Sequence, residues 1–281
     1  MAPTKLDLLI LGAGWTSTFL IPLLEKEGIS YAATTTTGRD GTYKFRFEGS
    51  EKNEKDNQEQ YAALPTAKTV LITFPLRGEH QSTHLYNSYV ETHNPDNAPY
   101  QFVQLGSTGI FTIPNQDLWV TRHSRYDKSN ARAIAEDELL QLGGCVLNLS
   151  GLWGGARQPR NWIDRVASTK EKLKEKTSLH LIHGHDVARA IVAVHRNFSR
   201  AMGQRFMLTD LLVHDWWALI LGFCGEDSEK NEKPPQIEWI RELMADNHIK
   251  ALPRSMEQLG RCYDSQSKTF TGDLSFEFSD S

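Results

Sequence analysis

A glycine-rich turn near the start of the chain carries the clearest chemical signal. The segment LGAGWTSTF places Gly12, Gly14 and Ser17 in a G-x-G-x-x-S pattern directly after a short apolar run. The first glycine permits a tight turn, and the second lets the backbone approach a pyrophosphate at the start of the next helix. The turn, with Trp15 and Thr16, is therefore predicted to bind a dinucleotide. The alternative is a packing turn in an α/β protein that binds no phosphate.

The choice between NAD and NADP depends on the end of the second predicted strand, in the segment ATTTTGRDG. An NAD site has an acidic residue there, which holds the ribose 2′-hydroxyl. This chain has none before the turn, and Arg39 follows shortly after Thr37. An arginine can bind a 2′-phosphate through charge-assisted hydrogen bonds. We therefore predict NADP, with NAD less favoured. In the alternative, Arg39 is a solvated turn residue and Asp40 binds the ribose.

These residues need a parallel sheet to position them, and the sequence supplies its pattern from residue 6 to about residue 153. The predicted strands are LDLLILGAG, SYAATTTTG, KTVLITFPL, YQFVQLGSTGIF and CVLNLSGLWGG, with YKFRF as an edge or hairpin strand. Helices are predicted at TSTFLIPLLEKEG, GEHQSTHLYNSYVETH and NARAIAEDELLQLGG. Such alternation is typical of βαβ units. The charge run EGSEKNEKDNQEQ is predicted to be a solvated loop.

The order of elements is looser in the second half of the chain. Helices are predicted at DVARAIVAVHRNF, HDWWALILGFCG and IEWIRELMADN, and the segment GEDSEKNEKPPQ is predicted to connect the last two. The final segment, GDLSFEFSDS, is predicted to be a strand or a frayed end.

Composition excludes several classes of protein. The 281 residues carry a net charge of −4 and 39% are hydrophobic, without the basic stripe of a nucleic-acid-binding protein. Three widely spaced cysteines argue against a disulfide framework or a zinc cluster and fit a reducing compartment. No apolar run is long enough for a membrane span, and no signal peptide is recognised, so a soluble cytoplasmic protein is expected. His183 and His185 have no third ligand at a telling spacing, so no metal site is predicted.

Four segments resemble landmarks of the extended short-chain dehydrogenase/reductases, in the same order along the chain. VQLGSTGIFT resembles the segment after their fifth strand, and LNLSGLWGGARQP the segment after their sixth. LHLIHGHDVARAIVAV and FMLTDLLVHDWWALI resemble the two landmarks that follow. The resemblance is closest to the atypical branch, which includes NAD-dependent epimerase/dehydratase-like proteins without the usual catalytic lysine. The part after Gly225 matches poorly.

The resemblance implies an α/β fold with a Rossmann-type doubly wound parallel sheet and a small C-terminal substrate lobe. Residues 1–165 would form the NAD(P)-binding core. Residues 166–281 would complete the sheet and form the substrate lobe, which is not an independent domain. At the end of the fourth strand, Phe74 and Pro75 would contact the adenine-side ribose; the alternative is core packing and a turn. In the landmark IHGHDVA, His183 and Asp186 are expected to be architectural, with Asp186 capping a helix.

The same resemblance assigns candidate catalytic residues. Ser107, with Thr108 beside it, matches the residue that holds the reacting oxygen. Tyr126 is aligned with the general acid or base, and Asn130 occupies the position of the usual lysine. Residues four apart share a helix face, so Asn130 could still reach a ribose hydroxyl. It has no charge, so the pKa of Tyr126 is expected to stay near 10. In the alternative, Tyr126 is a turn residue outside the active cleft.

A protonated tyrosine is a competent acid for reduction but a poor base for oxidation. We therefore expect an NADPH-dependent reductase of a small carbonyl-like substrate, with Thr108, Trp153 and Arg157 as substrate contacts. Two alternatives stay open. One is a non-redox isomerase, dehydratase or cyclase, and the other is a non-catalytic NADP-sensing regulator. The helix ARAIAEDELLQL could form a homodimer interface, although its polar face suits water equally well.

Overall fold

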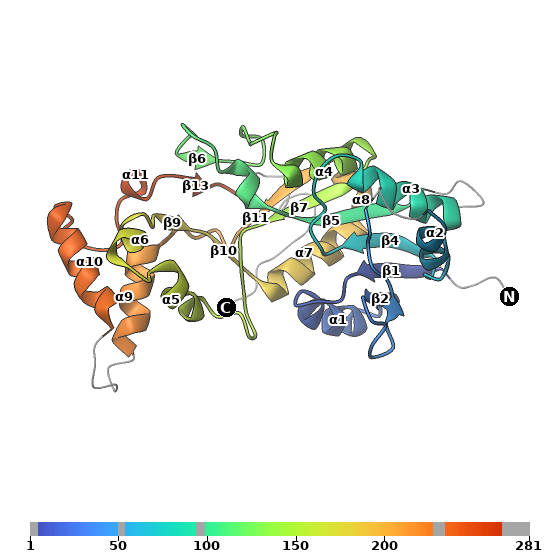
Figure 1. Ribbon diagram of the computed structural model, residues 1–281, viewed down its shortest axis with the longest axis horizontal. Helices are drawn as coiled ribbons and strands as arrows, with labels where there is room; N and C mark the ends of the chain where they lie inside the picture. Colours follow the sequence, from blue (N-terminus) through green and yellow to red (C-terminus); the bar gives the residue numbers. More distant parts are fainter. Residues whose placement is uncertain (1–4, 50–53, 94–98, 227–233, 266–281) are drawn as a thin grey trace.

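The computed structural model describes residues 5–49, 54–93, 99–226 and 234–265. A seven-stranded sheet forms its centre, in the order β11-β7-β5-β4-β1-β2-β3, and all neighbouring strands are parallel (Figure 1). The strands are β1 (Leu6–Leu11), β2 (Tyr31–Thr35), β3 (Tyr43–Lys44), β4 (Ala67–Ile72), β5 (Gln101–Ser107), β7 (Cys145–Leu149) and β11 (Arg205–Leu208). The predicted Rossmann-type α/β fold is therefore confirmed.

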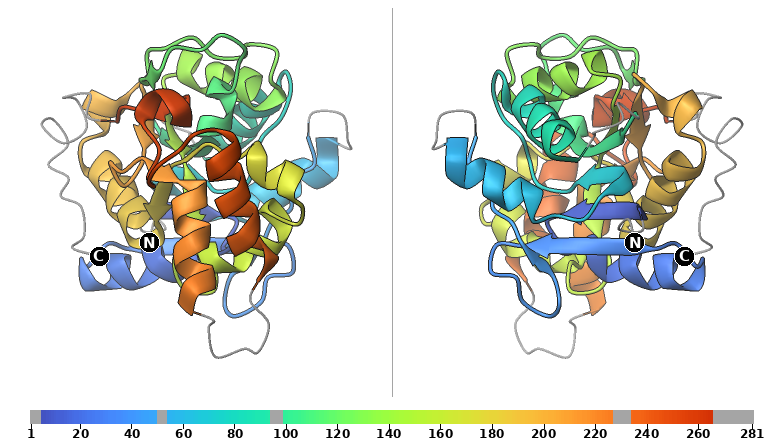
Figure 2. Two further views of the ribbon diagram at one scale, coloured as in Figure 1. Left: turned by 90° about the vertical axis from the view of Figure 1, so that its left-hand side faces the viewer. Right: turned by 90° about the vertical axis from the view of Figure 1, so that its right-hand side faces the viewer.

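Helices cover both faces of this sheet, as Figures 1 and 2 show. Helices α1 (Ser17–Lys26) and α7 (Gly184–Arg196) pack on one face, and their apolar side chains join those of β1, β5 and β7 in one buried cluster. Helices α3 (Gln81–His93) and α4 (Ala131–Gln141) bury theirs against the opposite face. The two-sided cover explains why strands such as LDLLIL are apolar at successive positions instead of alternating.

A smaller lobe, drawn in yellow to red in Figure 1, projects beyond the carboxyl ends of the strands. Its helices are α5 (Ile163–Val166), α6 (Lys170–Lys174), α9 (Trp216–Glu226), α10 (Pro235–Asp246) and α11 (Met256–Leu259). Helices α6, α9 and α10 share their own apolar core. A buried ion pair stabilises it, because Arg254 binds Asp215 at 2.7 Å and its guanidinium lies 3.9 Å from the centroid of the Trp217 ring.

Short strand pairs join the lobe to the sheet. Strand β8 (Gly151–Trp153) pairs with β10 (Leu181–His183), and β9 (Ser178–Leu179) pairs with β12 (His214–Asp215). Strand β6 (Trp119–Val120) pairs with β13 (Cys262–Tyr263). The 3₁₀ helices η1 (Thr108–Phe111) and η2 (Pro159–Trp162) and the short helix α8 (Phe198–Ala201) complete the described elements. No helix of the described residues is long and apolar enough to cross a membrane.

Two local expectations differ from the structure. The charge run was expected to be a loop, but its second half lies in helix α2 (Glu54–Ala62), where Tyr61 is fully buried against the sheet. One buried aromatic side chain is enough to dock a helix that is otherwise polar. The predicted strand YKFRF is reduced to the two residues of β3, because Phe45 turns inward and stacks edge-on against Tyr61. The predicted element at GDLSFEFSDS lies outside the described residues.

Candidate coenzyme site and adjoining cavity

The glycine turn lies where the strand order reverses, between β1 and β4. This is the place where open parallel sheets bind their ligands. Gly12 has a φ of +95°, and a Cβ atom on it would lie 2.7 Å from the Thr73 Oγ1 atom and 3.1 Å from the Phe74 ring. Its N–H donates to the Thr34 hydroxyl at 2.9 Å. Backbone conformation and close packing therefore both require glycine at this position.

Gly14 has the opposite surroundings, since nothing lies within 4 Å of the place where its Cβ would be. The next two residues, Trp15 and Thr16, line the same open space, and their backbone N–H groups have no partner among the described residues. Donors of this kind at the start of a helix attract anions. The turn is thus shaped to receive a phosphate. Ser17 is buried at the base of α1 and does not line this space, as expected of the third small residue of the pattern.

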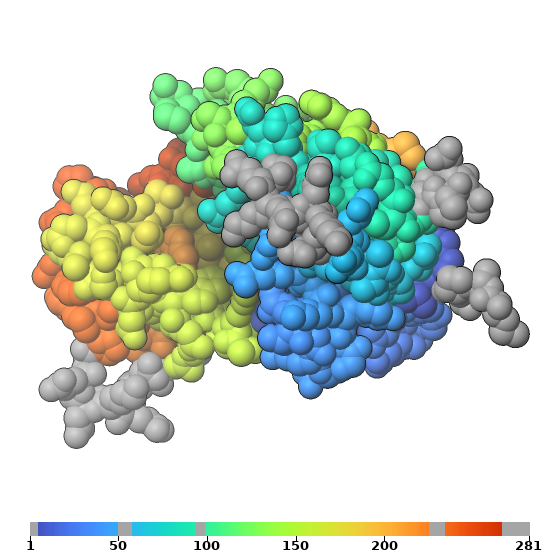
Figure 3. Space-filling model, turned by 45° about the vertical axis from the view of Figure 1, so that its right-hand side comes forward, coloured from blue at the N-terminus to red at the C-terminus, as the bar shows by residue number. Residues whose placement is uncertain are grey.

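A cleft of about 680 Å³ opens over this turn. Figure 3 shows the hollow between the blue N-terminal elements and the yellow-green segment that leads into the second lobe. The structure gathers in it all the residues proposed from the sequence for the coenzyme except Ser17, together with Arg157. Its wall is formed by Gly12, Ala13, Gly14, Trp15, Thr16, Thr35, Thr36, Thr37, Arg39, Thr73, Phe74, Pro75, Leu152 and Arg157.

Arg39 stands at the β2 end of the cleft. Its backbone is fixed because the N–H groups of Gly38 and Arg39 both donate to the Thr35 hydroxyl, at 3.0 and 3.2 Å. The side chain itself is 68% exposed, and its separation from the Asp40 carboxylate is 3.9 Å, too long for a strong pair. Asp40, the alternative ribose ligand, does not line the cleft. The guanidinium is therefore available to a phosphate.

Arg157 closes the opposite side of the cleft. Residues Gly154 and Arg157 form a tight turn through two backbone hydrogen bonds of 2.9 and 3.0 Å. That turn is fastened to the glycine turn, because the Trp15 indole N–H donates to the Gly154 carbonyl at 3.2 Å. The Arg157 guanidinium lies 4.5 Å from the centroid of the Trp15 ring. The sequence suggested a substrate contact for Arg157; in the structure this residue lines the same cleft as the glycine turn, and the substrate contact stays a prediction.

Ser107 and Thr108 stand at the end of β5 but line neither the cleft nor the cavity described below. The Ser107 hydroxyl accepts from the Gly109 N–H and so caps η1. Thr108 is buried and donates to the Leu149 carbonyl at 3.3 Å. The contact between Thr108 and a substrate stays a prediction without support from the geometry. The oxygen-holding role of Ser107 stays a prediction.

A buried carboxylate fixes this strand end. Glu136 of α4 accepts from the Ser107 N–H at 3.2 Å and from the Asn148 amide at 2.8 Å, and Arg205 lies 3.3 Å away. Burial raises the pKa of Glu136, while Asn148 and Arg205 act against that rise. The network ties the ends of β5 and β7 to α4. Glu136 is therefore suited to holding these strand ends in position and not to proton transfer.

Tyr126 and Asn130 do not share a helix face, so that expectation is wrong. Helix α4 begins only at Ala131, and the Asn130 side chain is its N-cap, accepting from the Arg132 N–H at 3.0 Å. The Tyr126 hydroxyl donates to the carboxylate of Asp137, at 2.9 and 3.0 Å. The Arg205 guanidinium stacks on its ring at 4.5 Å.

This environment also changes the proton affinity of Tyr126. Burial first, and then the hydrogen bond to Asp137, raise its pKa above 10, against the opposing effect of Arg205. The expected reference pKa is thus wrong. Tyr126 lines neither the cleft nor the cavity below, and its role as proton donor stays a prediction without support from the geometry.

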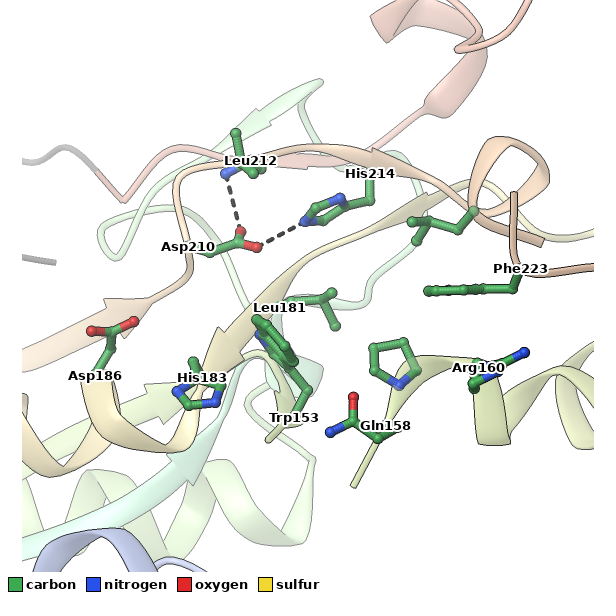
Figure 4. Close-up of a pocket in the computed structure, with 12 residues that line it drawn as sticks. Trp153, Gln158, Arg160, Leu181, His183, Asp186, Asp210, Leu212, His214 and Phe223 are labelled. Carbon is green, nitrogen blue, oxygen red and sulfur yellow. Dashed lines mark hydrogen bonds and ion pairs between the residues drawn. The ribbon is translucent and has the colours of Figure 1, made fainter. Parts of the chain in front are cut away.

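A second hollow, of about 330 Å³, adjoins the cleft inside the smaller lobe (Figure 4). It includes Trp153, one of the three substrate contacts proposed from the sequence. Its other lining residues come from η2, β10, α7, the segment before β12, and α9. They are Gln158, Pro159, Arg160, Leu181, His183, Asp186, Asp210, Leu212, His214, Leu219 and Phe223.

His183 is the N-cap of α7, because its Nδ1 atom accepts from the His185 N–H at 3.2 Å. Burial, with the nearby His185 second, lowers the pKa of His183. Asp186 lies in the first turn of α7 instead of capping it. Among the described residues, no group of three or more His, Cys, Asp or Glu side chains could hold a metal ion.

Sequence reasoning missed the polar residues of the second hollow, Asp210 and His214. They are four apart in the segment TDLLVHD, of which His214 and Asp215 belong to strand β12, and no motif marks them. It also missed Thr73 and Leu152 in the cleft. Thr73 lies near the carboxyl end of the predicted strand KTVLITFPL, which is the one signal that could have indicated it.

No family model and no curated protein matches this sequence. Solved structures do resemble the fold over almost the whole chain. Vestitone reductase from alfalfa (Medicago sativa) is 16% identical, with a TM-score of 0.65, over 98% of this chain and 94% of that protein. Yeast methylglyoxal/isovaleraldehyde reductase, solved with NADPH, is 15% identical, with a TM-score of 0.59, over 98% and 94%.

A short-chain dehydrogenase/reductase superfamily protein from Agrobacterium tumefaciens, solved with bound NAD, is 10% identical. Its TM-score is 0.58, over 88% of this chain and 100% of that one. At such identities the similarity shows the fold alone. The resemblance to the extended short-chain dehydrogenase/reductases is thus confirmed as a likeness of fold.

Proposed function

We propose that the protein is an NADP(H)-binding oxidoreductase that reduces a small carbonyl compound. The observation that carries the proposal is the cleft at the switch point of the sheet. It combines an open glycine turn, two unpartnered backbone N–H groups at the start of α1 and an arginine at each side. These are the groups that a dinucleotide diphosphate requires. The similar folds solved with NADPH and with NAD support a nicotinamide coenzyme.

The end of β2 favours NADP over NAD. The cleft residues from this part of the chain are Thr35, Thr36, Thr37 and Arg39, so no carboxylate lines the cleft where NAD-binding folds hold the ribose. Arg39 is exposed and its pairing with Asp40 is weak, so a 2′-phosphate would not have to displace a strong partner. When bound, the coenzyme would supply a hydride to the carbonyl carbon. The residues of this chain bind and orient it.

Three buried cysteines without disulfide partners, Cys145, Cys224 and Cys262, fit a reducing compartment such as the cytoplasm.

The position of Tyr126 favours a second candidate, a protein that binds NADP without hydride transfer. Its hydroxyl is bound to Asp137 and does not line the cleft, so the usual proton donor is not in place. Such a protein would be a non-redox enzyme on this fold or an NADP sensor. Turnover of a bound carbonyl compound with loss of NADPH absorbance would exclude this candidate.

The coenzyme is tested by titrating the protein with NADPH and NADH and following tryptophan fluorescence. Trp15 lies in the cleft wall and should report binding. We expect NADPH to bind more tightly. Arg39→Ala should weaken NADPH about 10- to 100-fold, because one charge-assisted contact contributes ~1.5–3 kcal/mol, and should leave NADH unchanged.

Arg46→Ala is the matched control, since this arginine is 74% exposed nearby and does not line the cleft. It should bind both nucleotides as the unaltered protein does. Absence of binding of either nucleotide would overturn the proposed function. Equal binding of both, unaffected by Arg39→Ala, would overturn the preference for NADP.

A further inference from the structure

The turn that follows β4 connects the coenzyme cleft with helix α4. Pro75 lines the cleft, and Arg77 lies two residues further along the same turn. The N–H of Gly78 donates at 2.8 Å to the carbonyl of Ala131, the first residue of α4. This bond holds Arg77 beside the first turn of α4, which carries Arg132.

Further contacts between the turn and α4 fix its shape. The N–H groups of His80 and Ser82 both donate to the carboxylate of Glu138. Gly78 and His80 have φ angles of +93° and +63°. A left-handed conformation is uncommon for histidine and persists only where the surrounding contacts impose it. The path of the turn, and with it the arginine that it carries, is therefore set by α4.

Arg132 is partly buried, yet its guanidinium forms no hydrogen bond or ion pair with a described residue, and the same holds for Arg77. Burial lowers the pKa of Arg132; Glu136 opposes this change and the nearby Arg77 adds to it. A guanidinium that loses part of its hydration is usually paired with an anion. Here two neighbouring cations are held together, and the part of the chain that the structure describes supplies no counter-ion.

The carboxylates of α4 cannot take that place, because other donors hold them. Glu136 accepts from the Asn148 amide at 2.8 Å and lies 3.3 Å from Arg205. Asp137 binds the same arginine at 2.9 Å. Glu138 holds the turn after β4. A counter-ion for the two arginines would therefore come from a ligand.

Two neighbouring guanidinium groups suit an oxyanion, because their planar N–H donors match the geometry of a carboxylate or a phosphate. Arg132 lies one helical turn before Glu136, whose carboxylate accepts from the Ser107 N–H at the end of β5. Arg77 follows the cleft wall at the end of β4. The two arginines thus lie beside the strand ends where the reacting oxygen of a substrate is predicted.

We propose that Arg77 and Arg132 together bind an oxyanion, a carboxylate or a phosphate, that the small carbonyl substrate carries. The substrate is then an acidic carbonyl compound, such as a 2-oxo acid, and not a neutral aldehyde or ketone. Neither arginine lines the cleft, so this site is separate from that of the coenzyme diphosphate. The assignment to a substrate rests on the proposed function, but anion binding by the two arginines can be measured without coenzyme.

The test uses benzoylformate, a 2-oxo acid, and its methyl ester as the matched molecule without charge. Inorganic phosphate is the second anionic probe, and it shows which oxyanion the site prefers. Arginine Nε–H signals of the full-length ¹⁵N-labelled protein are followed by NMR at constant ionic strength, and Arg77→Lys and Arg132→Lys assign the two signals. We expect benzoylformate to shift both signals and to bind about 10-fold more tightly than the ester, which corresponds to one hydrogen bond to a charged group.

The variants Arg77→Gln and Arg132→Gln should each weaken benzoylformate about 10-fold and leave the affinity for the ester unchanged. Arg132→Lys keeps the charge and should retain part of the preference for the acid. Arg196→Gln is the matched control, because Arg196 of α7 pairs with Glu27 at 2.9 Å on the other face of the sheet. It should behave as the unaltered protein. NADPH affinity should be the same in all these variants.

The outcomes separate the two proposals. Loss of the preference for the acid in both glutamine variants supports the anion site even if no nucleotide binds. Equal affinities for acid and ester, shifts confined to other arginine signals, or a preference that both glutamine variants keep would overturn it. A fall in NADPH affinity in these variants would assign the arginines to the coenzyme and overturn the assignment to the substrate. Failure of NADPH to bind the unaltered protein would overturn only the proposed reaction.

Discussion

Replacing Arg157 by alanine should weaken both nicotinamide nucleotides to the same degree. The guanidinium stacks on Trp15, which belongs to the glycine turn, and both side chains line the cleft. A diphosphate bound at the start of α1 would lie between that turn and Arg157. The diphosphate is common to NAD and NADP. Arg157 should therefore contribute affinity without selectivity, in contrast to Arg39 at the far end of the cleft.

The magnitude follows from two contacts. A charge-assisted hydrogen bond to phosphate contributes ~1.5–3 kcal/mol, or about 10- to 100-fold in the dissociation constant. The exposed stacking of Arg157 on Trp15 adds ~0.5–1 kcal/mol to the closure of the 154–157 turn. We expect Arg157→Ala to raise the dissociation constants of NADH and NADPH by about 10- to 100-fold each. The dissociation constants of Arg157→Lys should lie between those of the unaltered protein and of Arg157→Ala, since lysine keeps the charge but loses the planar stacking.

The assay is a titration with each nucleotide by calorimetry, because Arg157→Ala also changes the surroundings of the fluorescent Trp15. Arg160→Ala is the matched control: the same charge is removed three residues later, in the wall of the other cavity. It should leave both nucleotide affinities unchanged. In the double variant with Arg39→Ala, the losses in NADPH affinity should multiply, since distant sites act independently.

A loss confined to NADPH would show that Arg157 contacts the 2′-phosphate. No loss with either nucleotide would show that the arginine only closes the turn. Each result would refute the assignment of Arg157 to the diphosphate.

Two further predictions concern residues outside the cleft. Tyr126→Phe should lower the free energy of unfolding by about 1 kcal/mol, because Asp137 loses one hydrogen-bond donor but keeps Arg205. The substitution should leave NADPH affinity unchanged. Loss of carbonyl reduction by a stably folded variant would instead establish the tyrosine as proton donor. Burial lowers the pKa of His180 from 6.5 to about 4. As the pH falls, this histidine is therefore protonated in the unfolded chain before it is protonated in the folded protein, and the folded protein loses stability between pH 6.5 and 4. Between pH 7 and pH 5, the free energy of unfolding of the unaltered protein should fall by roughly 2 kcal/mol more than that of His180→Gln, as measured by denaturant unfolding at both pH values. Equal decreases in the two proteins would show that His180 is not the group responsible.

The parallel sheet could be read from the sequence because its signals are local. Apolar runs such as residues 6–11 and 67–72 are buried on both faces, and a strand in that position needs no alternating pattern. The glycine turn is equally local, since Gly12 and Gly14 act through their own backbone and lie five and three residues before Ser17, where helix α1 begins. The cleft residues were found for the same reason: they follow the carboxyl ends of strands that were placed correctly.

The smaller lobe could not be read in this way. Its cavity brings together residues from Trp153 to Phe223 that belong to six separate elements. Asp210 and His214 meet only because the chain between β11 and β12 bends back, and nothing in TDLLVHD requires that bend. The exposed position of Leu212 follows from the same bend. Long-range packing decides this site, and composition carries no trace of it.

The expectation that Tyr126 and Asn130 share a helix face failed at a helix boundary. A spacing of four residues has geometric meaning only if both residues lie inside one helix. Here Asn130 ends the loop and caps α4, a position in which asparagine is among the preferred residues, so the sequence did contain a warning. Once Asn130 is the cap, Tyr126 belongs to the loop, and its hydroxyl reaches Asp137 on the outer part of α4. Neither residue lines the cleft, so the positions of the usual tyrosine and lysine supply no side chain to it in this structure.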